Sequence, residues 1–144
     1  MSDPSPASPR RTVNDMVREA KARIEELSVD ELASEIEAGA VTLIDIRDPR
    51  ELWERGAIPG ARSMPRGMLE FWFDPESKYY RGGLDFGERY VVYCAGGGRS
   101  ALAADLLQDL GYTNVAHLTV GFNGWKEAGG AVEQVRPDPK YLSS

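Results

Sequence analysis

The chain has 144 residues, enough for one ordinary domain with tails and too few for two full domains. Its net charge of -6 argues against nucleic-acid binding, because proteins that bind a phosphate backbone normally present a basic face. The single cysteine, Cys94, excludes an intramolecular disulfide and a metal site built on several thiolates.

The N-terminal region is predicted to contain a tail and a helix. Residues 1–11 hold three prolines and three serines with almost no apolar surface, which indicates a flexible tail. The tail has no apolar run, so we expect neither a secretory signal nor a membrane anchor, and a cytoplasmic location. Apolar residues then recur at spacings of three and four over residues 12–27 and predict a helical extension. This helix is a candidate surface for homodimer formation.

The main domain is predicted over residues 28–132, with a polar tail at 133–144. Ser28 and Glu31 form a capping-box pattern that starts a helix ending at Gly39. Further helices are indicated by helical spacing of apolar residues, and short apolar runs between turn residues predict strands. The expected further helices are 49–55 and 99–110, and the expected strands are 40–46, 61–64, 90–93 and 115–118.

Two segments are less regular. Residues 66–89 begin with aromatic and aliphatic side chains and continue with many Gly, Pro and Asp residues, which predicts a short helix and then a long surface loop. The sequence GFNGW at 121–125 predicts a turn anchored by its two aromatic residues. Because strands alternate with helices, the whole pattern predicts an α/β fold with a parallel sheet covered by helices on both faces.

The only thiol lies at a position where such sheets bind ligands. Cys94 follows the expected strand 90–93, and open parallel sheets bind ligands beyond the carboxyl ends of their strands. Three glycines come next; they tolerate positive φ and allow several backbone N–H groups to point at an anion. The helix N-terminus near Arg99 and the Arg99 guanidinium add positive charge. The predicted anion-binding loop consists of Ala95, Gly96, Gly97, Gly98, Arg99 and Ser100.

We therefore expect Cys94 to be a reactive thiolate in a partly exposed, electropositive pocket. The alternative is a small core residue, which is what a lone cysteine at a strand end most often is. The run Gly-Gly-Gly-Arg argues against this alternative, since a structural turn needs only one or two special residues. A nucleotide-binding loop is also disfavoured, because the chain lacks the Lys-Ser/Thr of a P-loop and the spaced glycines of a dinucleotide fingerprint.

Two segments resemble the signatures of the rhodanese family. The first signature is an aspartate-x-arginine at a strand end, followed by a helix and a Gly-x-Ile-Pro-Gly-Ala turn. Residues 43–65 of this chain, LIDIRDPRELWERGAIPGARSMP, resemble this first signature. The rest of the family domain, from the active-site loop onward, resembles residues 94–125, CAGGGRSALAADLLQDLGYTNVAHLTVGFNGW. The resemblance covers roughly residues 28–130 and implies a rhodanese-like fold with a central parallel five-stranded sheet.

The resemblance also implies a reaction. Cys94 corresponds to the cysteine that takes sulfane sulfur from a small anionic donor such as thiosulfate and carries it as a persulfide. The sulfur then passes to cyanide, a thiol or a protein acceptor. This sulfurtransferase chemistry needs neither a metal nor a cofactor, so we expect none, and we expect no nucleic-acid or membrane partner.

Some residues outside the loop have predicted roles. We expect Asp45 and Arg47 to be structural supports through hydrogen bonds and ion pairing, because alternate residues at a strand end diverge and do not serve one site. The insertion around residues 71–80 is rich in aromatic side chains, and a minimal domain of this family would not need it. Trp72 and Tyr80 are therefore candidate wall residues of a pocket over the loop.

The remaining candidates are predicted to be structural or solvated. Ala57 stands where many family members have histidine, so this position lacks an imidazole and is expected to be structural. His117 is the sole histidine, and no matching acid is in view along the sequence, which favours a structural role. Four arginines are expected to be solvated surface charge: Arg62, Arg66, Arg81 and Arg89.

Two other functions compete with sulfur transfer. Cysteine phosphatases also place a cysteine loop ending in arginine before a helix, but they use five residues between the two, and here four separate Cys94 from Arg99. Phosphatases on the rhodanese fold also carry a second cysteine inside the first signature, where this chain has Ile46. The other alternative is a non-catalytic interaction module, as in rhodanese domains that have lost the cysteine. The intact loop argues against it.

Overall fold

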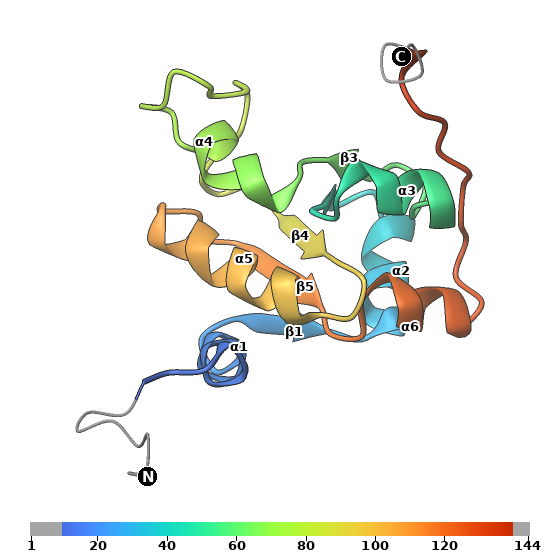
Figure 1. Ribbon diagram of the computed structural model, residues 1–144, viewed down its shortest axis with the longest axis horizontal. Helices are drawn as coiled ribbons and strands as arrows, with labels where there is room; N and C mark the ends of the chain where they lie inside the picture. The colour runs from blue at the N-terminus through green and yellow to red at the C-terminus, as the bar shows by residue number, and fades with distance from the viewer. Residues whose placement is uncertain (1–9, 140–144) are drawn as a thin grey trace, which may run out of the picture.

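Five parallel strands form the centre of the fold (Figure 1). The computed structural model describes residues 10–139. The sheet order is β1-β5-β4-β2-β3, so that β4, which leads into Cys94, is the central strand. The strands are β1 (Glu25–Leu27), β2 (Thr42–Asp45), β3 (Arg62–Ser63), β4 (Tyr90–Tyr93) and β5 (Val115–Leu118). The predicted parallel five-stranded α/β sheet is confirmed.

Helices cover both faces of this sheet, as predicted. They are α1 (Val13–Lys21), α2 (Val29–Glu37), α3 (Pro49–Arg55), the 3₁₀ turn η1 (Arg66–Met68), α4 (Leu69–Phe73), α5 (Gly98–Asp109) and α6 (Gly121–Glu127). Side chains along β4 alternate between the faces. Tyr90, Val92 and Cys94 pack with buried residues of α4 and α5, whereas Val91 and Tyr93 pack with those of α2 and α6. Cys94 therefore begins its loop from the α5 side of the sheet.

The pairing register places the strand ends that surround the loop. Asp45 of β2 lies opposite Tyr93 of β4, and Val92 of β4 lies opposite His117 of β5. Because all strands are parallel, these residues stand at the carboxyl edge of the sheet, where ligand sites of such folds form. Cys94 follows β4 at the same edge.

The N-terminal helix is shorter than the predicted helix over residues 12–27. It ends at Lys21, and Glu25–Leu27 form β1, which pairs in parallel with β5. Leu27 fits a helical spacing from α1, but the structure buries it at the sheet instead. The reason is that β1 satisfies the backbone groups of β5, which would otherwise be an open sheet edge. Val13 and Met16 remain exposed on α1, and homodimer formation through this helix stays a prediction.

The C-terminal part also differs in detail from the prediction. Residues 121–127 form α6 instead of a turn, because Phe122 and Trp125 are three residues apart and bury one helix face. The chain then runs back past α3, and Glu133 forms an antiparallel bridge with Ala57. The contacts of the domain thus extend past the predicted boundary at 132. Most of the predicted tail 1–11, and residues 140–144 of the C-terminal tail, lie outside the described residues.

The middle of the chain follows the prediction closely. η1 and α4 are the short helix predicted at the start of residues 66–89, and irregular chain then leads to β4. β3 is reduced to two residues of the predicted strand 61–64. Within residues 10–139, no helix combines the length and the apolar character needed to cross a membrane.

Candidate functional site

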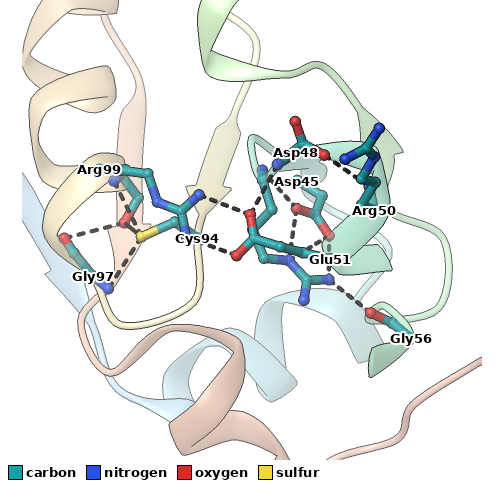
Figure 2. A network of polar contacts seen from close by, with 10 residues as sticks. Asp45, Asp48, Arg50, Glu51, Gly56, Cys94, Gly97 and Arg99 are labelled. Carbon is teal, nitrogen blue, oxygen red and sulfur yellow. Dashed lines mark hydrogen bonds and ion pairs between the residues drawn. The ribbon is translucent and has the colours of Figure 1, made fainter. Parts of the chain in front are cut away.

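The sulfur of Cys94 lies inside the turn that joins β4 to α5 (Figure 2). The backbone N–H of Gly97 donates to Sγ over 3.1 Å, and that of Ser100 donates over 3.4 Å. The Ser100 hydroxyl oxygen lies 3.5 Å from Sγ and accepts from the thiol. Backbone N–H groups converging at the start of α5 stabilise negative charge on the sulfur. The geometry of the loop can therefore stabilise negative charge on Cys94 Sγ.

Gly97 is the glycine on which the turn depends. Its φ is +109°, and a Cβ at this position would lie 2.2 Å from the carbonyl oxygen of Thr119. Gly96 and Gly98 do not have positive φ, and a Cβ on Gly96 would meet nothing within 4 Å. The positive φ that glycine tolerates is therefore used at one of the three loop positions. Among these three glycines, only Gly97 combines the left-handed conformation with a close backbone approach.

The start of α6 fixes the other side of the loop. The N–H of Phe122 donates to the carbonyl of Cys94 over 2.8 Å, and the N–H of Asn123 donates to that of Ala95 over 3.0 Å. Gly121 makes this approach possible, because a Cβ there would lie 2.3 Å from the Ala95 oxygen. With these carbonyls held on the α6 side, the loop N–H groups face inward, toward Sγ.

Cys94 is more deeply placed than the sequence suggested. Its exposed fraction is 1%. The expectation of a partly exposed pocket is therefore wrong, because the thiol is buried. Gly96 is exposed and the Arg99 side chain is 44% exposed, so the covering layer on this side is thin. The nearby surface hollow at the start of α3 is lined by Asp48, Pro49, Arg50 and Trp53 and does not include the thiol.

Arg99 does not lie free above the loop. Its Nη1 and Nη2 donate to the two carboxylate oxygens of Glu51 on α3, at 2.8 and 3.0 Å (Figure 2). The hydrogen bonds that Arg99 donates to Glu51 raise the pKa of Arg99, and the nearby Cys94 adds to that effect. The same pairing lowers the pKa of Glu51. Sequence reasoning missed Glu51, which offsets part of the positive charge near the sulfur.

Asp45 and Arg47 form a buried ion pair beside the site. Arg47 Nη2 lies 2.7 Å from Asp45 Oδ2, and both side chains are fully buried. The same Nη2 donates to the carbonyl of Gly56 over 2.7 Å, and the guanidinium lies over the ring of Phe122, 4.2 Å from its centroid. The two side chains converge, contrary to the expected divergence. They join the end of β2 to the end of α3 and to α6, which is the geometry of a structural support.

The structure does not bring Trp72 and Tyr80 to the loop. Arg81 lies over the Trp72 ring at 3.7 Å, and the hydroxyl of Tyr80 contacts the backbone of Leu84. The adjoining Phe73 packs against Tyr90 and Tyr112, which stand at the start of β4 and just beyond the end of α5. Figure 1 shows α4 beside the start of β4, whereas the loop follows its end. These aromatics pack at the far end of α5, and the pocket-wall expectation is corrected.

His117 is connected to the loop, which the sequence did not reveal. Its Nδ1 lies 2.8 Å from the hydroxyl oxygen of Ser100, and its Nε2 lies 2.9 Å from a carboxylate oxygen of Glu26 on β1. Burial lowers the pKa of His117, although the hydrogen bond with Glu26 acts in the opposite direction. The acid that seemed to be missing is supplied by a residue 91 positions away in the sequence.

No group of three His, Cys, Asp or Glu side chains that could hold a metal ion occurs among residues 10–139. The site therefore consists of a cysteine, converging N–H groups and an arginine that is paired with a carboxylate. Such a site can generate a nucleophilic thiolate and stabilise an anion bound to it.

The sequence is similar to known proteins over most of its length. The family model for the rhodanese-like domain matches residues 28–128. The thiosulfate sulfurtransferase GlpE of Shewanella oneidensis is 33% identical over 102 residues, covering 71% of this chain and 92% of that protein. The "Putative thiosulfate sulfurtransferase, mitochondrial" of Schizosaccharomyces pombe is 37% identical over 93 residues, covering 61% of this chain. The match spans 65% of the length of the yeast protein, which is less than two thirds.

A solved structure extends the similarity to more of the chain. A Rhodopseudomonas palustris protein has a TM-score of 0.79 and 44% identity, covering 89% of this chain and 98% of that one. It is described as a protein of unknown function and a possible tyrosine phosphatase. The shared fold therefore reaches beyond residues 28–128, and the descriptions of these similar proteins name different chemistry.

Proposed function

The chain belongs to the rhodanese-like domain family, and from this membership we propose that it is a sulfurtransferase working through a persulfide on Cys94. The observation that supports the proposal most directly is the convergence of the Gly97 and Ser100 N–H groups on Sγ, at 3.1 and 3.4 Å. These groups stabilise a charge on or next to the sulfur, which both a thiolate and a persulfide require.

The proposed reaction has two steps. The Cys94 thiolate attacks the sulfane sulfur of thiosulfate; a bond forms between the two sulfurs, and sulfite leaves with the electrons of the bond that breaks. A thiol, cyanide or a protein acceptor then attacks the outer sulfur, and the Cys94 thiolate leaves with the electron pair. No oxidant is consumed. The loop N–H groups keep the negative charge stabilised as it moves between the inner and outer sulfur.

Phosphatase chemistry is the second candidate, favoured by the description of the Rhodopseudomonas palustris protein. Two features of this chain argue against it. Four residues separate Cys94 from Arg99, and a phosphoryl group needs room for three equatorial oxygens around an in-line nucleophile. A leaving group also needs a general acid, but the carboxyls of Asp45 and Glu51 near the loop are both ion-paired with arginines.

A non-catalytic interaction module is disfavoured by the loop itself. An activated thiol environment has no use in a scaffold, and α6 and Gly97 hold this environment in place. We further propose a small anionic sulfur donor, a thiol or protein acceptor and a cytoplasmic location, with neither nucleic acid nor membrane as a partner. The net charge of -6 is in keeping with the absence of a nucleic-acid partner.

The test measures the sulfur adduct directly. Purified protein is incubated with thiosulfate, intact mass is measured for one added sulfur atom, and cyanide is then added to release thiocyanate. Wild type should gain and release the sulfur, and Cys94→Ser should do neither. In parallel, an aryl phosphate is offered to both proteins. Cleavage that depends on Cys94, without a sulfur adduct, would replace the sulfurtransferase proposal with the phosphatase one.

A further inference from the structure

A continuous series of polar contacts joins the active-site sulfur to the protein surface. It runs from Cys94 Sγ to Ser100 Oγ over 3.5 Å, from there to His117 Nδ1 over 2.8 Å, and from His117 Nε2 to Glu26 over 2.9 Å. Ser100 and His117 are fully buried, whereas one third of the Glu26 side chain is exposed. Cys94 lies in the loop between β4 and α5, and the other three members come from α5, β5 and β1.

The hydrogen-bonding capacity of these groups sets a direction. An ionised carboxylate can only accept, so Glu26 requires the proton of a neutral His117 to be on Nε2. Nδ1 then carries no proton, and it accepts a hydrogen bond from the Ser100 hydroxyl. The Ser100 oxygen in turn accepts from the Cys94 thiol, in agreement with the direction of that contact. Along this series of side chains, the donors therefore point from the sulfur toward Glu26. The carbonyl of Gly97, 3.3 Å from Ser100 Oγ, is a second and more distant acceptor for the Ser100 hydroxyl.

We propose that His117 is a positioning residue that accepts the thiol proton of Cys94 through Ser100. The S–H bond breaks as its proton moves to Ser100 Oγ, and the hydroxyl proton of Ser100 moves to His117 Nδ1. The products are a Cys94 thiolate and an imidazolium held by the Glu26 carboxylate, so charge and protons balance. The inference rests on the proposed function for the use that is made of this thiolate.

The charged groups around the imidazole suit this role. Glu26 on β1 faces Nε2, and Lys21 on α1 lies 3.8 Å from the same carboxylate. From α5 the ring meets the neutral hydroxyl of Ser100. Burial lowers the pKa of His117, Glu26 raises it and Lys21 lowers it, with a net lowering. The imidazole is therefore neutral near neutral pH, and the buried imidazolium that forms when it accepts the proton depends on the Glu26 carboxylate for its stability.

The test follows the rate of Cys94 alkylation by iodoacetamide as a function of pH, which requires no sulfur transfer. His117→Gln and Ser100→Ala should move the midpoint upward and slow alkylation at pH 7 by roughly tenfold, the size of losing one hydrogen bond to a charged group. Glu26→Gln keeps an acceptor but removes the charge, and should slow it by roughly threefold. The variant that combines His117→Gln with Ser100→Ala should be alkylated no more slowly than the slower of the two single variants, because Ser100 and His117 act in series.

Glu25 provides the matched control. It is the neighbour of Glu26 on β1, but its carboxylate pairs with Arg89 and makes no contact with His117. Glu25→Gln should therefore keep the wild-type alkylation profile. A purely structural role for His117 would lower the melting temperature of the variants and leave the pH midpoint in place, and that result would overturn the proposal. Since Glu26→Gln changes a partly exposed side chain, it gives an answer even where the buried variants fold poorly.

The outcome separates this inference from the proposed function. Shifted alkylation midpoints together with no thiosulfate adduct on wild type would retain the proton path and refute sulfur transfer. An adduct on wild type together with unshifted midpoints in Glu26→Gln and His117→Gln would retain sulfur transfer and refute the proton path.

Discussion

The guanidinium of Arg99 and the carboxylate of Glu51 form two parallel hydrogen bonds next to the active-site loop. Arg99 follows the glycines of the loop, and Glu51 belongs to the first turn of α3, where it also accepts from the N–H of Asp48 over 3.0 Å. The pair connects the loop to α3 and offsets the charge that would attract an anionic donor. The strength of donor binding should therefore depend on Glu51.

The first prediction is that Glu51→Gln lowers the KM for thiosulfate. With the carboxylate removed, the Arg99 charge is free to bind the thiosulfate dianion. We expect KM to decrease by roughly two- to fivefold, in keeping with the small interaction energy of a half-exposed ion pair. Steady-state thiocyanate formation measures it. Glu54→Gln removes the same charge from an exposed position on the same helix and should leave KM within error. Equal KM values in the two variants would show that Glu51 has no effect on the donor.

The second prediction concerns the glycines of the loop. Gly97→Ala should lower the free energy of unfolding by at least about 2 kcal/mol, because a side chain at φ +109° is strained and its Cβ meets Thr119. Gly96→Ala should change it by less than about 1 kcal/mol, since nothing lies near the added methyl group. Urea denaturation of both variants measures the difference. Similar losses in the two would contradict the assignment of the turn to Gly97.

The third prediction concerns the buried pair of Asp45 and Arg47. Asp45→Asn leaves a buried guanidinium without a counter-charge and should destabilise the fold by about 3–5 kcal/mol. The control is Asp105→Asn, which breaks the ion pair with Arg23, an arginine whose side chain is 53% exposed; it should cost less than about 1 kcal/mol. Chemical denaturation at pH 7 compares them. A cost for Asp45→Asn as small as that of the control would mean that the pair does not support the architecture.

The fold and the loop were largely predictable because their signals are local. The run YVVY before Cys94 and the glycines after it specify a strand and a tight turn over about ten consecutive residues. The partners of the loop were not predictable in the same way. Glu51 lies 48 positions before Arg99, and Glu26 lies 91 positions before His117. Their contacts arise only when α3 and β1 take their places in the fold.

Two wrong predictions have a common physical cause. Leu27 continued a helical spacing from the N-terminal helix, and Trp72 and Tyr80 belonged to an aromatic cluster without a clear period. In both cases tertiary packing decided the outcome. Residues 25–27 pair with the edge of β5 and so form a strand of the sheet. Phe73, which adjoins Trp72, packs on Tyr90 at the start of β4, far from the loop. Local patterns do not encode which end of a helix such residues will cover.

The fourth prediction is that His117 makes stability fall as the pH drops below about 6.5. Burial lowers the pKa of His117 in the folded state, so in this range the unfolded chain binds a proton that the folded chain does not, and protonation favours unfolding. The loss begins at the ordinary histidine pKa and is complete at the lower folded-state pKa. Because the chain has one histidine, few other groups titrate between pH 5 and 6.5.

The measurement is the free energy of unfolding in urea at several pH values between 5 and 8. Wild type should lose stability on acidification through this range, and His117→Gln should show a flatter profile even though its stability at pH 7 is lower. Carboxylates with lowered pKa, such as Glu25 and Glu51, lose their contribution only at lower pH, as they become protonated. Parallel profiles for the two proteins would mean that the folded and unfolded states bind the His117 proton equally, and that the imidazole is not held neutral between Ser100 and Glu26.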